Sequence, residues 1–175
     1  MDIKVQNGQG NALTVVSGIL SRKQKNPKTE HTARTIESSG RRKEAEKAQI
    51  TVTVEGRPAP VYGQRKLLEE LVFNLCDNAI RYNRPGGFVT MRSHFQDGQA
   101  ILVVSDTGIG IAKNEQERIF ERFYRVDKSH SRIIGGTGLG LSIVKHGVQL
   151  HQGDISLESQ PDKGTAITVR LPITL

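Results

Sequence analysis

Polar side chains recur at four-residue intervals along one apolar segment of the chain. Glu70, Asn74 and Asn78 are each four residues apart, so on a helix they would lie on one face. Arg81 and Tyr82 follow one turn later. Amide oxygens suit Mg2+, which prefers oxygen ligands and shares them with substrate phosphates, and a carboxylate one turn earlier could accept a proton. The alternative is a helix face that simply meets solvent, and the spacing alone does not decide between the two.

Two glycine-rich segments could also contact a ligand. Asp106–Gly110 (DTGIG) places a carboxylate and two glycines after an apolar strand, where the Asp could accept a hydrogen bond from an exocyclic amine such as that of adenine. Gly135–Leu141 (GGTGLGL) opens a helix, where glycines let backbone N–H groups converge on an anion. The second segment is not a P-loop, because no Gly-Lys-Ser/Thr closes it, and it does not follow a strand as a dinucleotide fingerprint would. Alone, either segment could be an ordinary turn.

The elements that must position these residues follow from hydrophobic spacing. Helical periodicity predicts helices over Gln64–Tyr82 and Leu139–Leu150, and alternation predicts a strand over Ile50–Val54. A shorter helix is expected near Glu115–Phe123, with Phe123 packed within the segment rather than against a ligand.

Two hairpins complete the predicted elements. Phe88–Phe95 and Ala100–Ser105 are joined through Asp97-Gly98, a strong turn signal. Asp154–Glu158 and Ala166–Leu171 form the second hairpin. Adjacent strand pairs with helices between them predict an α+β sandwich with a mostly antiparallel sheet.

Composition excludes several classes of protein. The chain has 175 residues, a net charge of +7 and one cysteine, Cys76, so an internal disulfide and a cysteine-ligated zinc module are excluded. Apolar runs are too short to span a bilayer, and the start has no signal-peptide pattern. Residues 1–49 hold ten Lys/Arg against five Asp/Glu, but these residues include no aromatic side chain that could stack on bases. Nucleic-acid binding is therefore disfavoured.

Together, in this order and spacing, the three polar blocks resemble the N, G1 and G2 boxes of the GHKL ATPase superfamily. They are most similar to those of the ATP-binding domain of bacterial sensor histidine kinases. The matching segments are Leu71–Tyr82 (N box), Asp106–Gly110 (G1), Arg118–Asp127 (the F box of the ATP lid), Gly136–Lys145 (G2), and Gly164-Thr165 with Val169–Pro172 as the closing strand. The resemblance covers residues 50–175 and implies a two-layer α/β sandwich of the Bergerat type with a flexible lid.

This resemblance implies roles in phosphoryl transfer. Asn74 would ligate Mg2+, and Glu70 would act as the carboxylate that accepts the proton of the attacking imidazole. Asn78 and Arg81 would contact phosphates, although most relatives have Lys at position 81 and Arg differs in reach and geometry. The lid arginines, Arg122 and Arg125, would offset the charge of the γ-phosphate.

The resemblance also implies how the nucleotide would be held. Asp106 would bind the adenine amine, Tyr82 would stack near the ring, and Thr165 would assist through water. Gly108 and Gly110 would permit the close approach of the backbone. The phosphates would be wrapped by Gly136, Gly138 and Gly140, and Thr137 and Leu139 would also bind the nucleotide.

The family pattern is incomplete at the N-terminal end. The phosphoacceptor motif, similar to His-Glu-x-x-Thr-Pro-Leu on a helical hairpin, has no match here. Counting back from Ala12–Gly18 places Asn7 where the His belongs, and the flanks of His31 do not match. We interpret residues 1–49 either as a solvated arm or as a shortened or degenerate dimerisation and phosphoacceptor region.

Two functional hypotheses follow. The first is a histidine kinase domain that binds Mg-ATP and transfers the γ-phosphoryl to a His of a helical hairpin, in cis or in trans, with a response regulator as a further partner. The second is a non-enzymatic pseudo-kinase that binds nucleotide and acts through partner contacts. A cytoplasmic location is expected, because Cys76 lies among apolar neighbours as a reduced core cysteine would. Full-length family members are often anchored to the membrane by segments that this sequence does not show.

Overall fold

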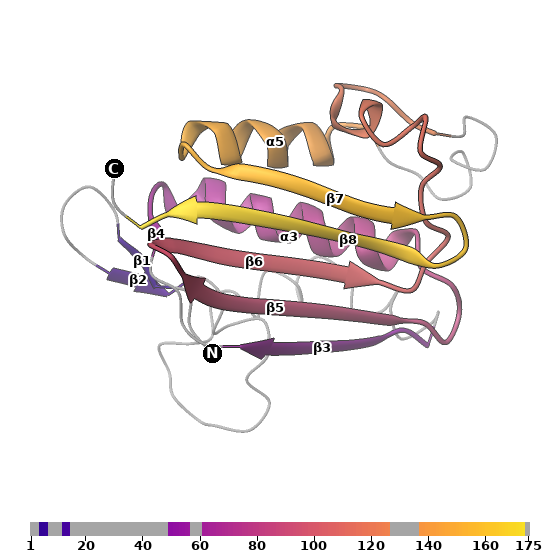
Figure 1. The fold of residues 1–175 in the computed structure, drawn as a ribbon, viewed down its shortest axis with the longest axis horizontal. Helices are drawn as coiled ribbons and strands as arrows, with labels where there is room; N and C mark the ends of the chain where they lie inside the picture. The colour runs from indigo at the N-terminus through magenta and orange to yellow at the C-terminus, as the bar shows by residue number, and fades with distance from the viewer. Residues whose placement is uncertain (1–3, 7–11, 15–48, 57–60, 127–136, 174–175) are drawn as a thin grey trace.

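The main sheet holds five strands in the order β3-β5-β6-β8-β7 (Figure 1). The computed structural model describes residues 4–6, 12–14, 49–56, 61–126 and 137–173. The strands of the sheet are β3 (Thr51–Gly56), β5 (Phe88–Gln96), β6 (Gln99–Asp106), β7 (Asp154–Gln160) and β8 (Gly164–Pro172). β3 pairs with β5 in parallel, and the other three pairings are antiparallel. The prediction of a mostly antiparallel α+β fold is confirmed.

Two helices of the described residues cover one face of this sheet. They are α3 (Arg65–Arg81) and α5 (Gly140–Leu150), and their bounds agree with the predicted helices to within one residue. Figure 1 shows α3 behind the sheet. Because α3 lies between β3 and β5 in the chain, it supplies the crossover that two parallel neighbours require.

A second, smaller sheet lies at one end of the main sheet (Figure 1). Its strands are β1 (Lys4–Gln6), β2 (Ala12–Thr14) and β4 (Val61–Tyr62), with β1 antiparallel to β2 and parallel to β4. None of these three strands was predicted from the sequence. Asn7 and His31 lie outside the described residues, so the interpretation of residues 1–49 stays a prediction.

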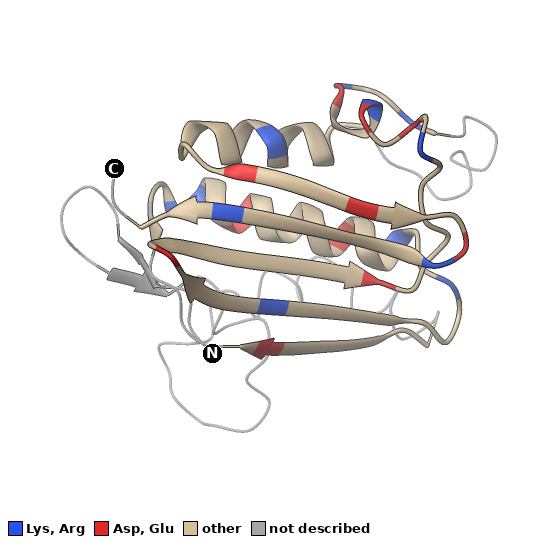
Figure 2. Ribbon diagram, viewed as in Figure 1, with Lys and Arg blue, Asp and Glu red and all other residues tan. Residues whose placement is uncertain are grey.

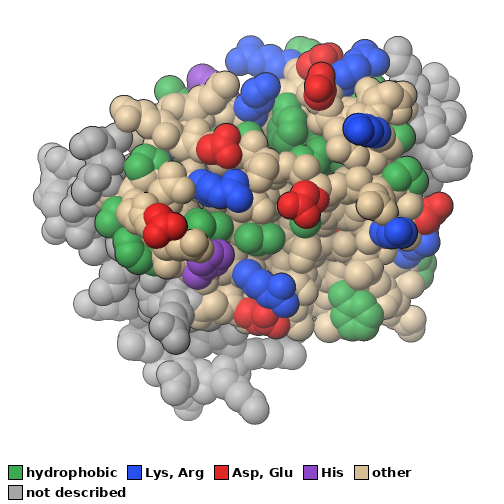
Figure 3. Space-filling view, viewed as in Figure 1, with side chains coloured by type: hydrophobic (Ala, Val, Ile, Leu, Met, Phe, Trp, Pro, Cys, Tyr) green, Lys and Arg blue, Asp and Glu red, His purple; other side chains and the backbone are tan. Residues whose placement is uncertain are grey.

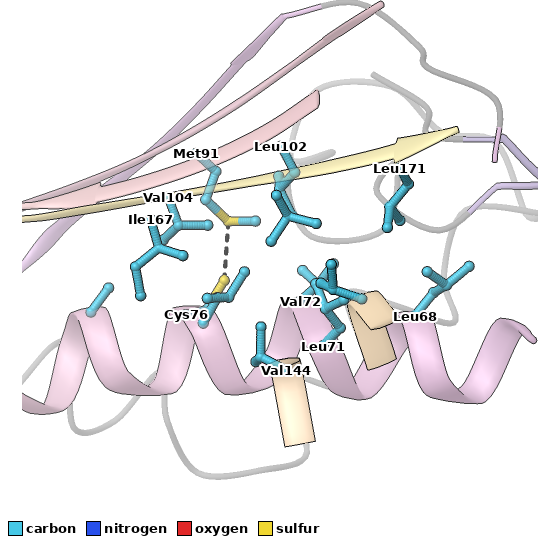
Figure 4. Packing of buried hydrophobic residues seen from close by; sticks show 14 of the residues in the cluster. Leu68, Leu71, Val72, Cys76, Met91, Leu102, Val104, Val144, Ile167 and Leu171 are labelled. Atoms are coloured by element: carbon cyan, nitrogen blue, oxygen red, sulfur yellow. Dashed lines mark hydrogen bonds between the residues drawn. The ribbon is translucent and has the colours of Figure 1, made fainter. Parts of the chain in front are cut away.

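The core lies between α3 and the sheet (Figure 4). Apolar side chains of α3, among them Leu71 and Leu75, pack against residues of β5, β6 and β8 such as Met91. Cys76 donates a hydrogen bond to the sulfur of Met91 across 3.2 Å. Burial raises the pKa of Cys76 to about 12, as expected for a thiol enclosed in the core.

The opposite face of the sheet carries charged side chains of both signs (Figures 2 and 3). Arg92 pairs with Glu55 at 2.8 Å, and Arg170 contacts Asp154 at 3.5 Å and the hydroxyl of Ser156 at 3.0 Å. These pairs are exposed or only partly covered, as on a solvated surface. The predicted site residues instead gather on the helical side and at one end of the strands.

Candidate functional site

The polar stripe of α3 is held in place by the helix itself. The side-chain amide of Asn74 donates to the backbone carbonyl of Glu70 at 2.8 Å, and that of Asn78 donates to the carbonyl of Asn74 at 2.9 Å. Each amide nitrogen is therefore committed to the preceding turn. The Asn74 amide oxygen lies near the N-terminus of α5, and Glu70 stands exposed one turn earlier.

The N-terminus of α5 closes on this stripe. A methyl group at Gly140 would lie 3.0 Å from the amide oxygen of Asn74 and 3.4 Å from the amide nitrogen of Asn78. The helices thus approach closely where glycine leaves room, and they bring the predicted metal ligand beside the predicted phosphate-binding turn. In that turn, the N–H of Leu139 donates to the hydroxyl of Thr137 at 3.3 Å. Gly136, the first glycine of the predicted G2 box, lies outside the described residues.

Asp106 ends β6 at the other side of the site. Its carboxylate accepts the N–H of Gly108 at 2.8 Å and also a backbone N–H from Thr165 on the neighbouring strand β8. Burial raises the pKa of Asp106, and these two hydrogen bonds partly oppose that effect. A half-buried carboxylate with two backbone donors keeps its orientation and has remaining acceptor capacity for a ligand.

The DTGIG loop is wedged between two other parts of the chain. The N–H of Ile109 donates to the carbonyl of Tyr82 at 3.1 Å, and a side chain at Gly108 would overlap that same carbonyl. On the far side, the N–H of Asp162 in the β7–β8 turn donates to the carbonyl of Ile109 at 2.8 Å. Gly110, with a φ of +67°, lies against the same turn. The loop therefore joins the end of α3 to the closing hairpin.

Arg81 has a partner within its own helix. Its guanidinium contacts the carboxylate of Asp77 at 3.2 Å, and both side chains are largely covered. Tyr82 is half-buried at the end of α3. The phosphate contact expected for Arg81 stays a prediction. In this structure the guanidinium is held by its ion pair with Asp77.

The predicted helix over Glu115–Phe123 is wrong in extent. Only a single 3-10 turn, η1 (Arg118–Phe120), forms there, and the chain on either side consists of turns. Phe123 has a φ of +64° and is 72% exposed, so the expected packing of this ring within the lid is also wrong.

Contacts along the lid replace the regular helix. Arg118 stacks over the ring of Tyr124 at 4.2 Å. The N–H of Phe123 donates to the carbonyl of Gly138 at 2.9 Å, which ties the end of the lid to the glycine turn. Of the two lid arginines, Arg122 is exposed and Arg125 is half-buried.

Two residues that the sequence analysis missed hold the start of the lid. The side-chain amide of Gln116 donates to the carbonyls of Ile111 (3.0 Å) and Ser159 (2.9 Å). The hydroxyl of Ser159 accepts the N–H of Ile111 at 2.8 Å and lies 2.9 Å from the hydroxyl of Thr165. A signal existed for Ser159, because it is the polar member of an otherwise apolar alternating series on β7. No comparable pattern marks Gln116.

The site holds no cluster of acidic, His or Cys side chains suited to a metal. Across the part of the chain that the structure describes, no group of three such residues comes together. A divalent ion here would depend on amide oxygen and on the phosphates of a ligand. In the same described residues, no helix is long and apolar enough to cross a bilayer.

Comparison with known proteins places this arrangement in a family. The model of the histidine kinase-, DNA gyrase B- and HSP90-like ATPases matches residues 63–175. The chain is 46% identical over 129 residues to the sensor-like histidine kinase SenX3 of Mycolicibacterium smegmatis, a match that covers 73% of this chain and 34% of that protein. It is 50% identical over 114 residues to the sensor histidine kinase RppB of Synechocystis, covering 64% of this chain and 25% of that protein.

A solved structure agrees with this assignment. The mycobacterial sensor histidine kinase MprB superposes with a TM-score of 0.67 at 37% identity, over 82% of this chain and 93% of that one. The chain spans about a third or less of the length of the two curated relatives above. The family match nevertheless covers well over half of the chain, including α3, the DTGIG loop and α5. The chain therefore belongs to the histidine kinase-, DNA gyrase B- and HSP90-like ATPases, and within that family it carries the nucleotide-binding catalytic domain of a histidine kinase.

Proposed function

We propose that this domain binds Mg-ATP and transfers the γ-phosphoryl group to a histidine of a phosphoacceptor hairpin in two-component signalling. The observation that carries the proposal is the approach of α3 to α5, where the amide oxygen of Asn74 lies 3.0 Å from the place that a Cβ of Gly140 would occupy. This approach unites a hard oxygen ligand, a glycine turn and a helix N-terminus, which are the parts needed to bind a polyphosphate.

The donor set supports a magnesium site at Asn74. Because its amide nitrogen is bonded to the Glu70 carbonyl, an amide flip would set two oxygens against each other. The oxygen therefore stays available as a ligand. The amide oxygen of Asn74 would be the protein ligand of Mg2+, which would supply charge that neutralises the phosphates. Asn78 and the turn Thr137–Gly140 would contact the phosphates, and the side chain of Arg81 would have to share its charge between them and Asp77.

The base would be recognised on the opposite side of the site. The carboxylate of Asp106 is oriented by Gly108 and Thr165 and can accept the exocyclic amine of adenine. Tyr82 lies at the end of α3, where its carbonyl holds Ile109. Gly108 and Gly110 keep the loop compact enough for a ring to approach, since a side chain at either would overlap a neighbouring carbonyl.

Transfer would take place beside the exposed end of the polar stripe. The imidazole nitrogen forms a bond to the γ-phosphorus as the bond to the bridging β–γ oxygen breaks, and ADP leaves with that electron pair. Glu70 is exposed and can accept the proton that the imidazole loses. Arg122 and Arg125 would stabilise charge on the transferring group.

The partners follow from this chemistry. The acceptor would be a helical hairpin, in cis or in trans, and its phosphohistidine would pass the group to a response regulator. The curated relatives are much longer than this chain. A cytoplasmic location of the domain is part of the same proposal. The pseudo-kinase hypothesis predicts nucleotide binding without transfer.

Phosphoryl transfer from γ-labelled ATP tests the proposal. The chain is incubated with Mg2+, alone and with the acceptor hairpin of a related kinase. We expect acid-labile label on the hairpin. Bound ATP without label on any of several related hairpins would favour the pseudo-kinase, and label on the chain itself would locate an acceptor within it.

A matched pair of variants isolates the proposed proton acceptor. Glu70→Gln should lower the transfer rate at least about a hundredfold while ATP still binds. Glu69→Gln is the control, because Glu69 pairs with Arg65 at 2.7 Å, one position away from the polar stripe. Equal rates in the two variants would contradict the role of Glu70.

A further inference from the structure

The hydroxyl of Ser159 has a complete set of hydrogen bonds. It donates to the carbonyl of Gly164 at 2.9 Å and accepts the N–H of Ile111 at 2.8 Å. Its third neighbour is the hydroxyl of Thr165 at 2.9 Å. A hydroxyl carries one proton and two lone pairs. Since the proton goes to Gly164 and one lone pair to Ile111, the remaining lone pair is available only as an acceptor.

The other two hydrogen bonds of Ser159 determine which hydroxyl donates in its contact with Thr165. The Thr165 hydroxyl must donate its proton to Ser159, because Ser159 has no second proton to give. The proton of Thr165 is then engaged with Ser159, and its oxygen keeps two lone pairs with which it can accept. On the neighbouring strand, Asp106 is the register partner of Thr165, and its carboxylate accepts the backbone N–H of the same threonine. Two oxygen acceptors thus lie side by side on neighbouring strands.

We infer that Ser159 is a positioning residue for base selection: by taking the proton of Thr165, it makes that hydroxyl an acceptor only. The inference rests on the proposed function, since it presupposes that a nucleotide base lies at Asp106. A Thr165 oxygen that only accepts hydrogen bonds favours a base with an exocyclic amine, which it contacts directly or through a water molecule. It disfavours a base with a keto oxygen at that position, because neither oxygen can donate to the other. Ser159 does not touch the base in this scheme and acts through Thr165.

Hypoxanthine is the sharpest comparison with adenine. The two bases differ at one edge, where hypoxanthine has a keto oxygen in place of the amine and a protonated ring nitrogen beside it. Without Ser159, the Thr165 hydroxyl could turn and donate to that keto oxygen. Discrimination should therefore fall even though Asp106 is unchanged.

The test compares ADP with IDP binding to the full chain by calorimetry in Mg2+, since diphosphates avoid phosphoryl transfer. The wild type should prefer ADP. Ser159→Ala should lower the ADP-to-IDP affinity ratio about three- to tenfold, the range of one hydrogen bond. In a Thr165→Val background, the same change should leave the ratio unmoved.

The control is Ser156→Ala, the same substitution on the solvated face of β7, which should leave the ratio unchanged. Ser159→Cys, which keeps the volume but has a weak acceptor, should shift the ratio in the same direction and serves if the alanine variant does not fold. An unchanged ratio in these Ser159 variants, or an equal fall for both nucleotides, overturns the inference. A wild type that binds neither nucleotide refutes the proposed function instead.

Discussion

A methyl group added at Gly110 should separate the nucleotide loop from the closing hairpin. Gly110 has a φ of +67°, and a Cβ there would overlap the carbonyl oxygen of Gln160, lie 2.6 Å from its carbonyl carbon and 3.1 Å from the Cα of Pro161. These are backbone atoms, so no side chain can turn away. The carbonyl carbon would have to retreat by about 0.8 Å to reach the 3.4 Å of an ordinary contact.

The expected loss of stability has three parts. A left-handed conformation costs a non-glycine residue roughly 1–2 kcal/mol. Overpacking against the turn adds about 1–3 kcal/mol. The hydrogen bond from Asp162 to Ile109 spans the same gap at 2.8 Å, and its loss adds about 1 kcal/mol. Gly110→Ala should therefore destabilise the domain by about 3–6 kcal/mol and weaken nucleotide binding.

Two other glycines provide matched controls. Gly86 and Gly98 have φ values of +77° and +74°, but an added Cβ would meet nothing within 4 Å at either. Gly86→Ala and Gly98→Ala should lose only the roughly 1–2 kcal/mol of the backbone strain. Urea unfolding with ADP titrations measures both effects. If Gly110→Ala proves no less stable than the two controls, the loop is not held by the hairpin.

Four further predictions concern the site and the core. Burial raises the pKa of Asp106. The stability that its protonated form confers is therefore present below the pKa of the unfolded state and is lost as pH rises through the pKa of the folded state. Asp106→Asn should therefore raise the melting temperature near pH 7 relative to wild type. ADP affinity should have the opposite pH dependence and fall on acidification, because a protonated carboxyl has lost its charge and accepts the amine more weakly. A titration flat from pH 7 to pH 4 would contradict this. Asn74→Ala should lower ATP affinity at least about tenfold in Mg2+ but leave it unchanged in EDTA, and equal losses in both buffers would argue against the ligand role. Cys76, with its pKa raised to about 12, should resist alkylation at pH 8 in the folded protein and react promptly in urea, as mass spectrometry would show.

Much of this architecture was predictable because it depends on regular periodicity. The apolar spacing of α3 and the Asp97-Gly98 turn are local signals, and both elements form where they were predicted. The lid departs from its pattern because contacts rather than periodicity determine its course. Arg118 stacks on Tyr124, and Phe123 takes a positive φ where the chain meets Gly138.

The predicted site residues were mostly those within the recognisable boxes. The structure brings Asn74, Asn78 and Gly140 together and sets Asp106 beside Thr165. Ser159 and Gln116 were not predicted, because they act through contacts with residues 43 or more positions away in the chain. Gln116 also donates to backbone carbonyls, which every residue possesses. A hydrogen bond to a backbone group leaves no trace in the identity of its acceptor.

The strand order has a consequence for synthesis on the ribosome. β8 lies between β6 and β7 in the sheet, although it follows both in the chain. A nascent chain that has not yet released β8 cannot pair β7 with the sheet, and it lacks Thr165 beside Asp106. The five-stranded sheet can therefore close only after β8 has left the ribosome, so folding of the whole sheet has to wait for the last strand to be made.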